Sequence, residues 1–446
     1  MDMLVVHGGT TLNGRVTVEG AKNAALPIMA AALAVPGCTT LRRVPKLVDV
    51  RTMELLLGSL GVRFEHRHDG EVVVDASNVT SQHADYELVR RMRAGICVLG
   101  PLLARFGCAH VSLPGGCNIG HRPIDLHLKG MEALGAKIRL ENGYVVAKGH
   151  QLRGTEISLS GPFGSTVTGT CNVMTAACLA KGRTILRSAA CEPEVVDLAD
   201  FLNSAGAEIS GHGTSVIEIK GVENLWATAH RIIPDRIEAA TLALAVAATR
   251  GNVIIDGVRP EHLQSVLETM SRMDINVRCS ADQIQIDADR PLRTCDITAL
   301  PYPEIPSDAQ AQFMALMTTI SGTSVVRDRV FPDRFMHVSE LARMGADIRL
   351  EGSTAIVSGG RPLTGAAVMA CDLRASAALV IAALAASGRS EIRRIYHLDR
   401  GYSALETRLQ QLGANIRRCH DPESPGIDRK PHFHQMQQLQ NQPHPF

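Results

Sequence analysis

The sequence predicts an α/β fold of two similar domains, each built from three copies of one β-α-β-α-β-β unit. Three observations lead to this prediction. A short phrase recurs six times, helical and strand-like segments alternate within each copy, and 446 residues exceed what one ordinary hydrophobic core holds. Apolar residues make up 45% of the chain, so there is enough apolar mass for two packed interiors. Ligand chemistry is most naturally expected in the cleft between two such domains.

The recurring phrase marks the end of a helix and the start of a strand. In each copy an apolar residue, a glycine and a second apolar residue follow an amphipathic segment, and Asp274 replaces the glycine in the fourth copy. Successive copies are 68 to 74 residues apart. A solenoid repeat is shorter, typically about 20 to 50 residues. The six copies are Leu60-Gly61-Val62, Leu134-Gly135-Ala136, Ala205-Gly206-Ala207, Met273-Asp274-Ile275, Met344-Gly345-Ala346 and Leu412-Gly413-Ala414.

The first helix of each unit is rich in alanine and other small residues. Small side chains let a helix approach its neighbours closely, so we expect these helices to be buried. The predicted helices cover residues 23–33, 170–180, 237–248, 309–320 and 375–386.

A strand, a second helix and two further strands complete the unit. Residues 182–186 are an example of the first of these strands. The second helix carries apolar residues at three- and four-residue spacing, as Val50, Met53 and Leu57 do in the first copy. The glycine of the phrase ends this helix as a C-cap residue. The two closing strands are joined in the first copy by a turn at Asp69-Gly70.

Composition and cysteine usage exclude several classes of protein. The net charge is +1 at pH 7, and no segment has the basic patch of a nucleic-acid-binding protein. The eleven cysteines include no CxxC pair, which fits a reducing cytoplasm better than a disulfide framework or a zinc site. The N-terminus lacks the basic and apolar regions of a signal peptide, and the longest apolar stretch, residues 24–36, is too short to span a bilayer. We therefore expect a cytoplasmic protein without membrane insertion.

Cys117 stands out among the cysteines because of its neighbours. It follows Gly115 and Gly116, which allow close approach of backbone and ligand, and Arg122 lies five residues on. Cationic neighbours lower the pKa of a thiol and make it reactive. The setting favours chemistry on an anionic substrate, and the alternative is a small buried apolar residue.

The repeat is accompanied by five short motifs. They are Gly20-Ala21-Lys22-Asn23, the Cys117 loop, Pro234-Asp235-Arg236-Ile237-Glu238, Arg334-Phe335-Met336-His337 and Asp399-Arg400-Gly401-Tyr402. Together they resemble the enolpyruvyl transferases, the family that also contains EPSP synthase. The resemblance covers about residues 1–418 and is specific, because EPSP synthase shares the fold but lacks the cysteine loop. It implies two inside-out α/β domains, each with three repeats, helices inside and sheets outside, and an active site in the cleft between them.

The resemblance also implies that the first strand of the chain crosses to the second domain. We expect residues 22–233 to form the first domain, with the Cys117 loop as a lid, and residues 1–21 with 234–419 to form the second. Residues 420–446 are rich in His, Gln and Pro and lack apolar mass for a core, so we expect a disordered tail. A metal-binding tail is the alternative.

The reaction that the resemblance implies moves the enolpyruvyl group of phosphoenolpyruvate to the 3'-hydroxyl of UDP-N-acetylglucosamine. The hydroxyl attacks C2 of phosphoenolpyruvate while C3 gains a proton, and loss of phosphate then leaves an enolpyruvyl ether. The reaction needs no metal, cofactor or redox step. It is the first committed step of peptidoglycan synthesis, and fosfomycin targets the family member that catalyses it.

Four residues carry this chemistry by resemblance. Cys117 would deliver the proton to C3, Asp308 would accept the hydroxyl proton, and Lys22 and Arg400 would bind the anion. Asp308 is also expected to cap the helix at residues 309–320. For Lys22 alone the alternative is a surface lysine.

The substrate-binding residues implied by the resemblance surround the anion, the sugar and the uridine. They are Lys22, Asn23, Arg93, Arg122, Pro123, Ile124, Asp125, Leu126, Gly164, Ser165, Thr166, Val167, Asp308, Val330, Asp372, Arg374 and Arg400. Arg374 is either a ligand of the substrate or an ion-pair partner of such a ligand. Glu192 and His397 occur in matching motifs and are expected to be structural.

The chain departs from the family pattern at five positions. Cys97 and Cys191 stand where Trp and Arg are frequent, and Ser307 replaces a frequent Thr. In the uridine loop, Thr166-Val167-Thr168 stands where Ser-Val-Gly is common. None of these changes removes a charge that contacts phosphoenolpyruvate. Two alternatives therefore stay open: a transferase that acts on another uridine nucleotide, and an inactive relative that only binds a UDP-sugar.

Overall fold

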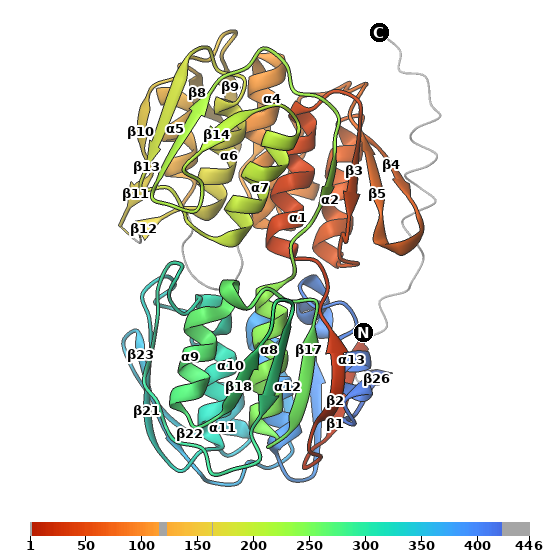
Figure 1. The fold of residues 1–446 in the computed structure, drawn as a ribbon, viewed down its shortest axis with the longest axis vertical. Helices are drawn as coiled ribbons and strands as arrows, with labels where there is room; N and C mark the ends of the chain where they lie inside the picture. Colours follow the sequence, from red (N-terminus) through yellow and green to blue (C-terminus); the bar gives the residue numbers. More distant parts are fainter. Residues whose placement is uncertain (1, 116–122, 163, 422–446) are drawn as a thin grey trace.

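The structure consists of two halves that stack end to end (Figure 1). The computed structural model describes residues 2–115, 123–162 and 164–421. Within these residues the strands form six four-stranded sheets and one two-stranded sheet, and each half holds three of the larger sheets. Each half also has its own cluster of buried apolar residues. The predicted α/β fold of two similar halves is confirmed.

The first half contains the sheets β16-β3-β5-β4, β6-β7-β9-β8 and β10-β13-β15-β14. Its strands are β3 (Cys38–Arg42), β4 (Arg63–His66), β5 (Val72–Asp75), β6 (His83–Ala84), β7 (Cys108–Ser112), β8 (Lys137–Glu141), β9 (Tyr144–Lys148), β10 (Glu156–Ser158), β11 (Ser160–Gly161), β12 (Gly164–Ser165), β13 (Arg183–Arg187), β14 (Glu208–Ser210), β15 (Val216–Lys220) and β16 (Ala229–Arg231). Its helices are α1 (Lys22–Ala31), α2 (Val48–Ser59), α3 (Tyr86–Val89), α4 (Leu99–Phe106), α5 (Asp125–Ala133), α6 (Val167–Ala177) and α7 (Pro193–Ser204), with 3-10 turns η1 (Ala32–Ala34), η2 (His68–Gly70) and η3 (Arg93–Val98).

The second half contains the sheets β18-β19-β17-β2, β20-β21-β23-β22 and β24-β25-β1-β26. Its strands are β1 (Asp2–His7), β2 (Asn13–Thr17), β17 (Asn252–Asp256), β18 (Asn276–Cys279), β19 (Gln283–Asp287), β20 (Ile297–Ala299), β21 (Gly322–Asp328), β22 (Asp347–Glu351), β23 (Thr354–Gly359), β24 (Ala367–Met369), β25 (Arg389–Arg393) and β26 (Asn415–His420). Its helices are α8 (Arg236–Ala248), α9 (Gln264–Arg272), α10 (Ser307–Thr318), α11 (Val338–Arg343), α12 (Leu373–Ala385) and α13 (Leu405–Gln411), with 3-10 turns η4 (Pro260–Leu263) and η5 (Ile395–Arg400).

All six large sheets share one strand order, and three of them borrow a strand from elsewhere in the chain. In each sheet one edge strand runs parallel to its neighbour and the other pairings are antiparallel. Strand β2 supplies that parallel edge strand to the fourth unit, and β16 supplies it to the first unit. Strand β1 pairs with β25 and β26 and so takes the place of the last strand of the sixth unit. The N-terminal strands thus belong to the second half.

The alanine-rich helices lie inside each half. In the first half α1, α4 and α6 contact one another, and in the second half α8, α10 and α12 do so. Every residue of α8 is buried. The five predicted inner helices are confirmed as α1, α6, α8, α10 and α12, although each begins slightly before the predicted residue. Capping side chains fix three of these starts, because Thr166, Asp235 and Asp372 each accept a hydrogen bond from the first turn.

Two passages of the chain connect the halves and lie side by side. Gly20 forms an isolated bridge with Pro234, and the backbone N–H of Ala21 donates to the carbonyl oxygen of Ile233 at 2.7 Å. A side chain on Gly20 would come within 1.9 Å of the carbonyl oxygen of Arg43, so glycine is required there. Helices α1 and α8 begin directly after these passages. Their first residues therefore lie where the halves meet.

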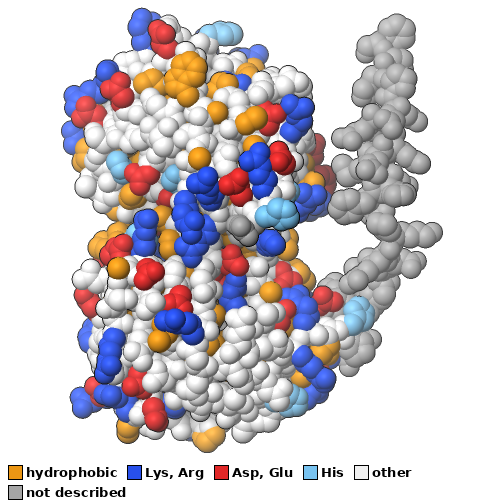
Figure 2. Space-filling view, turned by 45° about the vertical axis from the view of Figure 1, so that its right-hand side comes forward, with side chains coloured by type: hydrophobic (Ala, Val, Ile, Leu, Met, Phe, Trp, Pro, Cys, Tyr) orange, Lys and Arg blue, Asp and Glu red, His pale blue; other side chains and the backbone are white. Residues whose placement is uncertain are grey.

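The limits of the two predicted domains, 22–233 and 1–21 with 234–419, stay a prediction as limits of independent folding units. Strand β26 continues to His420, so the predicted tail starts inside that strand, and residues 422–446 lie outside the described residues. In the described part of the chain no helix is both long and apolar enough to cross a membrane. On the face shown in Figure 2, Lys and Arg side chains gather where the two halves meet, with acidic side chains among them.

Candidate active site

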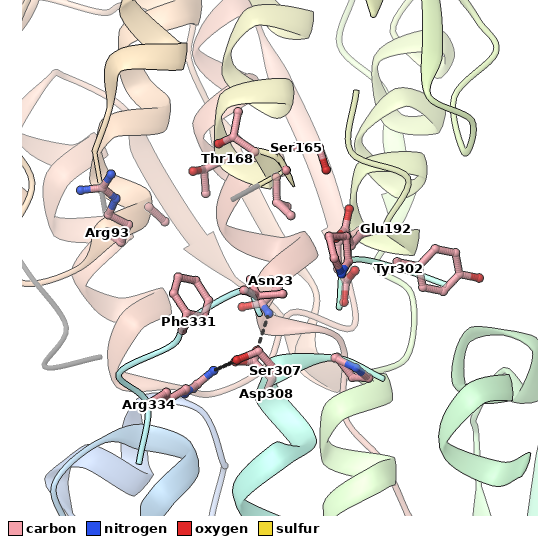
Figure 3. A pocket seen from close by; sticks show the side chains of 18 of the residues that line it. Asn23, Arg93, Ser165, Thr168, Glu192, Tyr302, Ser307, Asp308, Phe331 and Arg334 are labelled. Carbon is pink, nitrogen blue, oxygen red and sulfur yellow. Dashed lines mark hydrogen bonds and ion pairs between the residues drawn. The ribbon is translucent and has the colours of Figure 1, made fainter. Parts of the chain in front are cut away.

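A cavity of about 480 Å³ lies between the two halves, and both halves line it (Figure 3). The starts of five inner helices, α1, α6, α8, α10 and α12, contribute to its wall. The N-terminus of a helix carries a partial positive charge and exposed N–H groups. Five such ends around one cavity favour an anionic ligand.

Asp308 lies at the centre of the polar contacts in this cavity. Its Oδ1 accepts a hydrogen bond from Arg334 Nη1 at 2.8 Å, and its Oδ2 accepts from Asn23 Nδ2 at 3.4 Å (Figure 3). Arg374 Nη2 lies 3.4 Å from the same Oδ2. Asn23 and Asp308 belong to opposite halves and are 285 positions apart in the sequence. The contact therefore joins the two halves directly at the cavity.

The expectation that Asp308 caps its helix is wrong. Helix α10 begins at Ser307, so Asp308 lies within the first turn, and Pro306 at the N-cap position offers no side-chain hydrogen bond. The carboxylate turns to arginine and asparagine side chains instead. It is 28% exposed and remains accessible from the cavity.

The charges around Asp308 keep its carboxylate ionised. Burial alone would raise the pKa of Asp308, but the guanidinium groups of Arg374 and Arg334, together with the ammonium group of Lys22, hold this pKa well below its usual range. The side chains of Arg334 and Arg374 are almost fully buried, at 4% and 1% exposure. They are therefore poorly screened by solvent, and the cavity without substrate presents a firmly anionic carboxylate.

Lys22 and Arg400 form a second polar cluster around Asp49. Lys22 Nζ lies 3.4 Å from Asp49 Oδ2, and Arg400 Nε lies 2.8 Å from Asp49 Oδ1. Lys22 begins α1 and Asp49 lies in the first turn of α2, both in the first half, whereas Arg400 ends η5 in the second half. Lys22 and Arg400 line the cavity. The two predicted anion ligands are thus brought together, although they come from opposite halves.

The environment of Lys22 disfavours the charged form of its side chain. Burial lowers the pKa of Lys22 below its usual value, Asp49 and Asp308 oppose this effect, and Arg374 and Arg400 add to it. A phosphate or carboxylate in the cavity would supply the missing negative charge. The surface-lysine alternative is excluded, because Lys22 is only 8% exposed.

Most of the described substrate-binding residues expected from the sequence line this cavity. They are Lys22, Asn23, Arg93, Pro123, Asp125, Leu126, Gly164, Ser165, Thr166, Val167, Asp308, Val330, Asp372 and Arg400. Ile124 packs against the apolar cluster of the first half instead. Arg374 lies behind the wall and contacts Asp308, as expected for an ion-pair partner. The predicted residues Cys117 and Arg122 lie outside the described residues.

The first-half wall of the cavity is held by local hydrogen bonds. Arg93 Nη2 donates to the carbonyl oxygen of Pro123 at 2.7 Å. Thr168, one of the departures from the family pattern, lies 3.2 Å from His127 Nε2, and the other ring nitrogen of His127 contacts Asn172 at 3.0 Å. Figure 3 shows Arg93, Ser165 and Thr168 along this wall, opposite Asp308. Thr168 therefore has a defined partner in this chain.

Several residues in or directly behind the cavity wall were not predicted as site residues. Arg334 was seen only as part of a motif, and Asp49 only as an unremarked position in an amphipathic helix. Glu192 and His397, expected to be structural, both line the cavity. Burial raises the pKa of Glu192, although Arg236 opposes the shift, and Glu192 Oε2 has no hydrogen-bond partner among the described residues. The matching motifs were the available signal for Arg334, Glu192 and His397, whereas Asp49 lies in none of these motifs.

Three of the described thiols have raised pKa values and are not activated. Burial raises the pKa of Cys97 to about 12, although Arg93 opposes this shift. Burial likewise raises the pKa of Cys371, which lines the cavity, to about 12. Cys191 also has a raised pKa because of burial. Among the described residues, no group of three or more His, Cys, Asp or Glu side chains could hold a metal ion.

The chain is similar to curated proteins of one kind over almost its whole length. It is 50% identical to "UDP-N-acetylglucosamine 1-carboxyvinyltransferase" of Desulfatibacillum aliphaticivorans, over 94% of this chain and 100% of that protein. It is 51% identical to the protein of the same name from Coxiella burnetii (strain Dugway 5J108-111), over 94% of this chain and 96% of that protein.

Solved structures and a family model agree with this similarity. The enolpyruvyl transferase NikO from Streptomyces tendae has a TM-score of 0.85 at 27% identity, and the match covers 94% of this chain and 99% of NikO. EPSP synthase from Acinetobacter baumannii has a TM-score of 0.72 at 18% identity, covering 94% and 100%, and shows the shared fold. The family model of EPSP synthase (3-phosphoshikimate 1-carboxyvinyltransferase) matches residues 6–409. The chain therefore belongs to the EPSP synthase family of enolpyruvyl transferases.

Proposed function

We propose that this chain transfers the enolpyruvyl group of phosphoenolpyruvate to the 3'-hydroxyl of UDP-N-acetylglucosamine, the first committed step of peptidoglycan synthesis. The observation that carries the proposal is the cavity between the halves, where Asp308 faces Lys22 and Arg400 in a chain about half identical to relatives with this named activity. A carboxylate for the hydroxyl and cations for phosphoenolpyruvate are the groups that this reaction needs.

The reaction is an addition followed by an elimination. The 3'-oxygen forms a bond to C2 of phosphoenolpyruvate while C3 takes up a proton and the hydroxyl proton goes to a base. Loss of a proton from C3 and cleavage of the C2–O bond to phosphate then regenerate the double bond. Lys22, Arg400 and the five helix N-termini stabilise the anionic phosphate and carboxylate throughout.

Asp308 is proposed as the base that accepts the hydroxyl proton. In the cavity without substrate its pKa is held low by Arg374 and Arg334, so the carboxylate is ionised and ready to accept a hydrogen bond. Phosphoenolpyruvate bound beside these cations adds negative charge, which raises the pKa of Asp308 towards a range suited to proton transfer. Arg334 and Asn23 fix the direction of the carboxylate meanwhile.

Cys117 is proposed as the acid that protonates C3, and Arg122 as a further anion ligand. This part of the proposal rests on the sequence motif, because both residues lie outside the described residues. Among the described residues, Arg93 lies next to this segment, because it donates a hydrogen bond to the carbonyl oxygen of Pro123, the residue that follows Arg122. We also propose that the reaction takes place in the cytoplasm, since the cysteine usage fits a reducing compartment.

A second candidate acceptor is another uridine nucleotide, because the chain departs from the family pattern at Cys97, Cys191 and Thr168. Phosphate release from phosphoenolpyruvate distinguishes the candidates when it is measured with UDP-N-acetylglucosamine and, separately, with UMP. We expect release with UDP-N-acetylglucosamine alone. Release with UMP alone would identify the second candidate, and release with neither would indicate a relative that only binds.

A further inference from the structure

Asp49 joins the two cations that the proposed function assigns to phosphoenolpyruvate. Its Oδ1 accepts from Arg400 Nε at 2.8 Å, and its Oδ2 lies 3.4 Å from Arg400 Nη2 and 3.4 Å from Lys22 Nζ. The Arg400 contact uses two nitrogens on one edge of the guanidinium group, which fixes its plane as well as its position. One carboxylate thus orients both cations.

Asp49 does this from behind the site. It is 4% exposed and does not belong to the cavity wall, whereas Lys22 and Arg400 do. Its place in the first turn of α2 is set by the helix, so the carboxylate has a rigid support. A carboxylate placed this way leaves the cavity itself to the substrate.

The ion pair between Asp49 and Arg400 also crosses between the halves. The two residues are 351 positions apart, and they link α2 of the first half to η5 of the second. Lys22 and Arg400 repel one another, and this repulsion lowers the pKa of Lys22. A shared buried carboxylate between them offsets that repulsion and holds both cations at one site.

We propose that Asp49 is a positioning residue that builds the phosphoenolpyruvate site by holding Arg400 of the second half against Lys22 of the first. The inference rests on the proposed function, because it concerns how the substrate anion is bound there. Asp49 does not touch the substrate and takes no proton. It holds one cation from each half together at a single anion site.

The test compares Asp49→Asn with Glu54→Gln in the full-length chain. Asparagine is nearly isosteric but loses the ion pair. Glu54 is a matched control, because it lies on the same helix and its side chain is as buried as that of Asp49, at 5% exposure. Glu54 forms ion pairs with Arg51 and His66, and neither of these lines the cavity. For each protein the KM for phosphoenolpyruvate is measured by phosphate release, and the Kd for UDP-N-acetylglucosamine alone is measured by calorimetry.

For Asp49→Asn we expect the KM for phosphoenolpyruvate to rise about tenfold or more, while the Kd for UDP-N-acetylglucosamine changes less than about twofold. Glu54→Gln should leave both constants within about twofold of wild type. Weaker binding of both phosphoenolpyruvate and UDP-N-acetylglucosamine would indicate a general structural defect and would overturn the proposal. Tighter binding of phosphoenolpyruvate would also overturn it, since Asp49 would then be a competitor of the anion.

A second variant, Asp49→Glu, keeps the test decisive if Asp49→Asn does not fold. It retains the charge and moves the carboxylate by one methylene group. We expect an increase of about threefold or more in the KM for phosphoenolpyruvate with an unchanged Kd for the nucleotide sugar. An unchanged KM in this variant would contradict the positioning role. A wild-type chain that releases no phosphate would instead contradict the proposed function, so the two failures are distinguishable.

Discussion

Asp308, Lys22 and Arg400 lie at one cavity, and each is held by a buried partner of opposite charge. Asp308 is fixed by Arg334 and Arg374, and the two cations are fixed by Asp49. Buried pairs of this kind are poorly screened and keep their geometry, whereas exposed ion pairs contribute little. These three side chains therefore depend on buried partners, of which Arg334 belongs to the cavity wall and Arg374 and Asp49 lie behind it.

Replacing Asp308 tests its role as a base. Asp308→Asn keeps the shape of the side chain and its hydrogen bond to Asn23 or Arg334, but the amide cannot take the hydroxyl proton. We expect turnover to fall by about 10²- to 10⁴-fold with the Kd for UDP-N-acetylglucosamine little changed. Turnover within about twofold of wild type, measured by phosphate release, would show that Asp308 only binds.

Fosfomycin provides a test of Cys117 among the eleven cysteines. The thiolate is the reactive form, and burial raises the pKa of Cys97 and of Cys371 to about 12, so these thiols should not react. We expect mass spectrometry to find one adduct, on the peptide with Cys117, and none in Cys117→Ser. Cys117→Asp should retain turnover, because a carboxylic acid can donate the same proton, yet escape alkylation. An adduct on Cys97 or Cys191 would contradict the assignment.

At the scale of elements, the cavity is made by helix starts. The inner helices α1, α6, α8, α10 and α12 all begin at the junction of the halves, and their first residues carry the polar side chains of the site. The alanine-rich bodies of these helices fill the interiors and leave only their ends at the cavity. The same elements therefore provide both the stability of each half and the positive end that attracts an anion.

Glu238, in the first turn of α8 beside the two connecting passages, makes stability depend on pH. Burial raises its pKa to about 7, although Arg408, 2.7 Å away, opposes the shift. An acid whose pKa is raised on folding stabilises the folded state fully below pH 4.5, and this contribution is lost as the pH rises towards 7. We expect Glu238→Gln to flatten the fall in free energy of unfolding between pH 4.5 and 7, by up to about 3 kcal/mol.

Denaturant unfolding of wild type and Glu238→Gln at several pH values across this window would check the prediction. If the free energy of unfolding falls equally with pH in both proteins, Glu238 does not titrate between pH 4.5 and 7.

The sequence predicted the elements better than their ends. The inner helices and the six phrases follow from alanine content and glycine C-caps, which are local signals. The start of α10 was misplaced by two residues, because Asp308 was expected to cap the helix, whereas α10 begins at Ser307 and the Asp308 carboxylate contacts Arg334. Asp49 carries no local signal at all, because its partner Arg400 is 351 positions away. Contacts at such separation depend on how the halves meet.

At the scale of the whole molecule, the site exists only because the halves meet. Asn23 contacts Asp308 across the junction, and Asp49 contacts Arg400 across it. Each half alone would hold an incomplete set of charges. The crossing of β1 and β2 into the second half ties the start of α1, and with it Lys22, to the sheets on the other side.

The measurement that tests this account most directly is the analysis of the products formed from phosphoenolpyruvate and UDP-N-acetylglucosamine. Mass spectrometry and a phosphate assay on the same reaction should find the enolpyruvyl ether of the nucleotide sugar and inorganic phosphate in equal amounts. Asp308→Asn in parallel should form neither at a comparable rate. Phosphate without the ether would mean that the cavity hydrolyses phosphoenolpyruvate. An absence of both products with the wild-type protein would contradict enolpyruvyl transfer at this site.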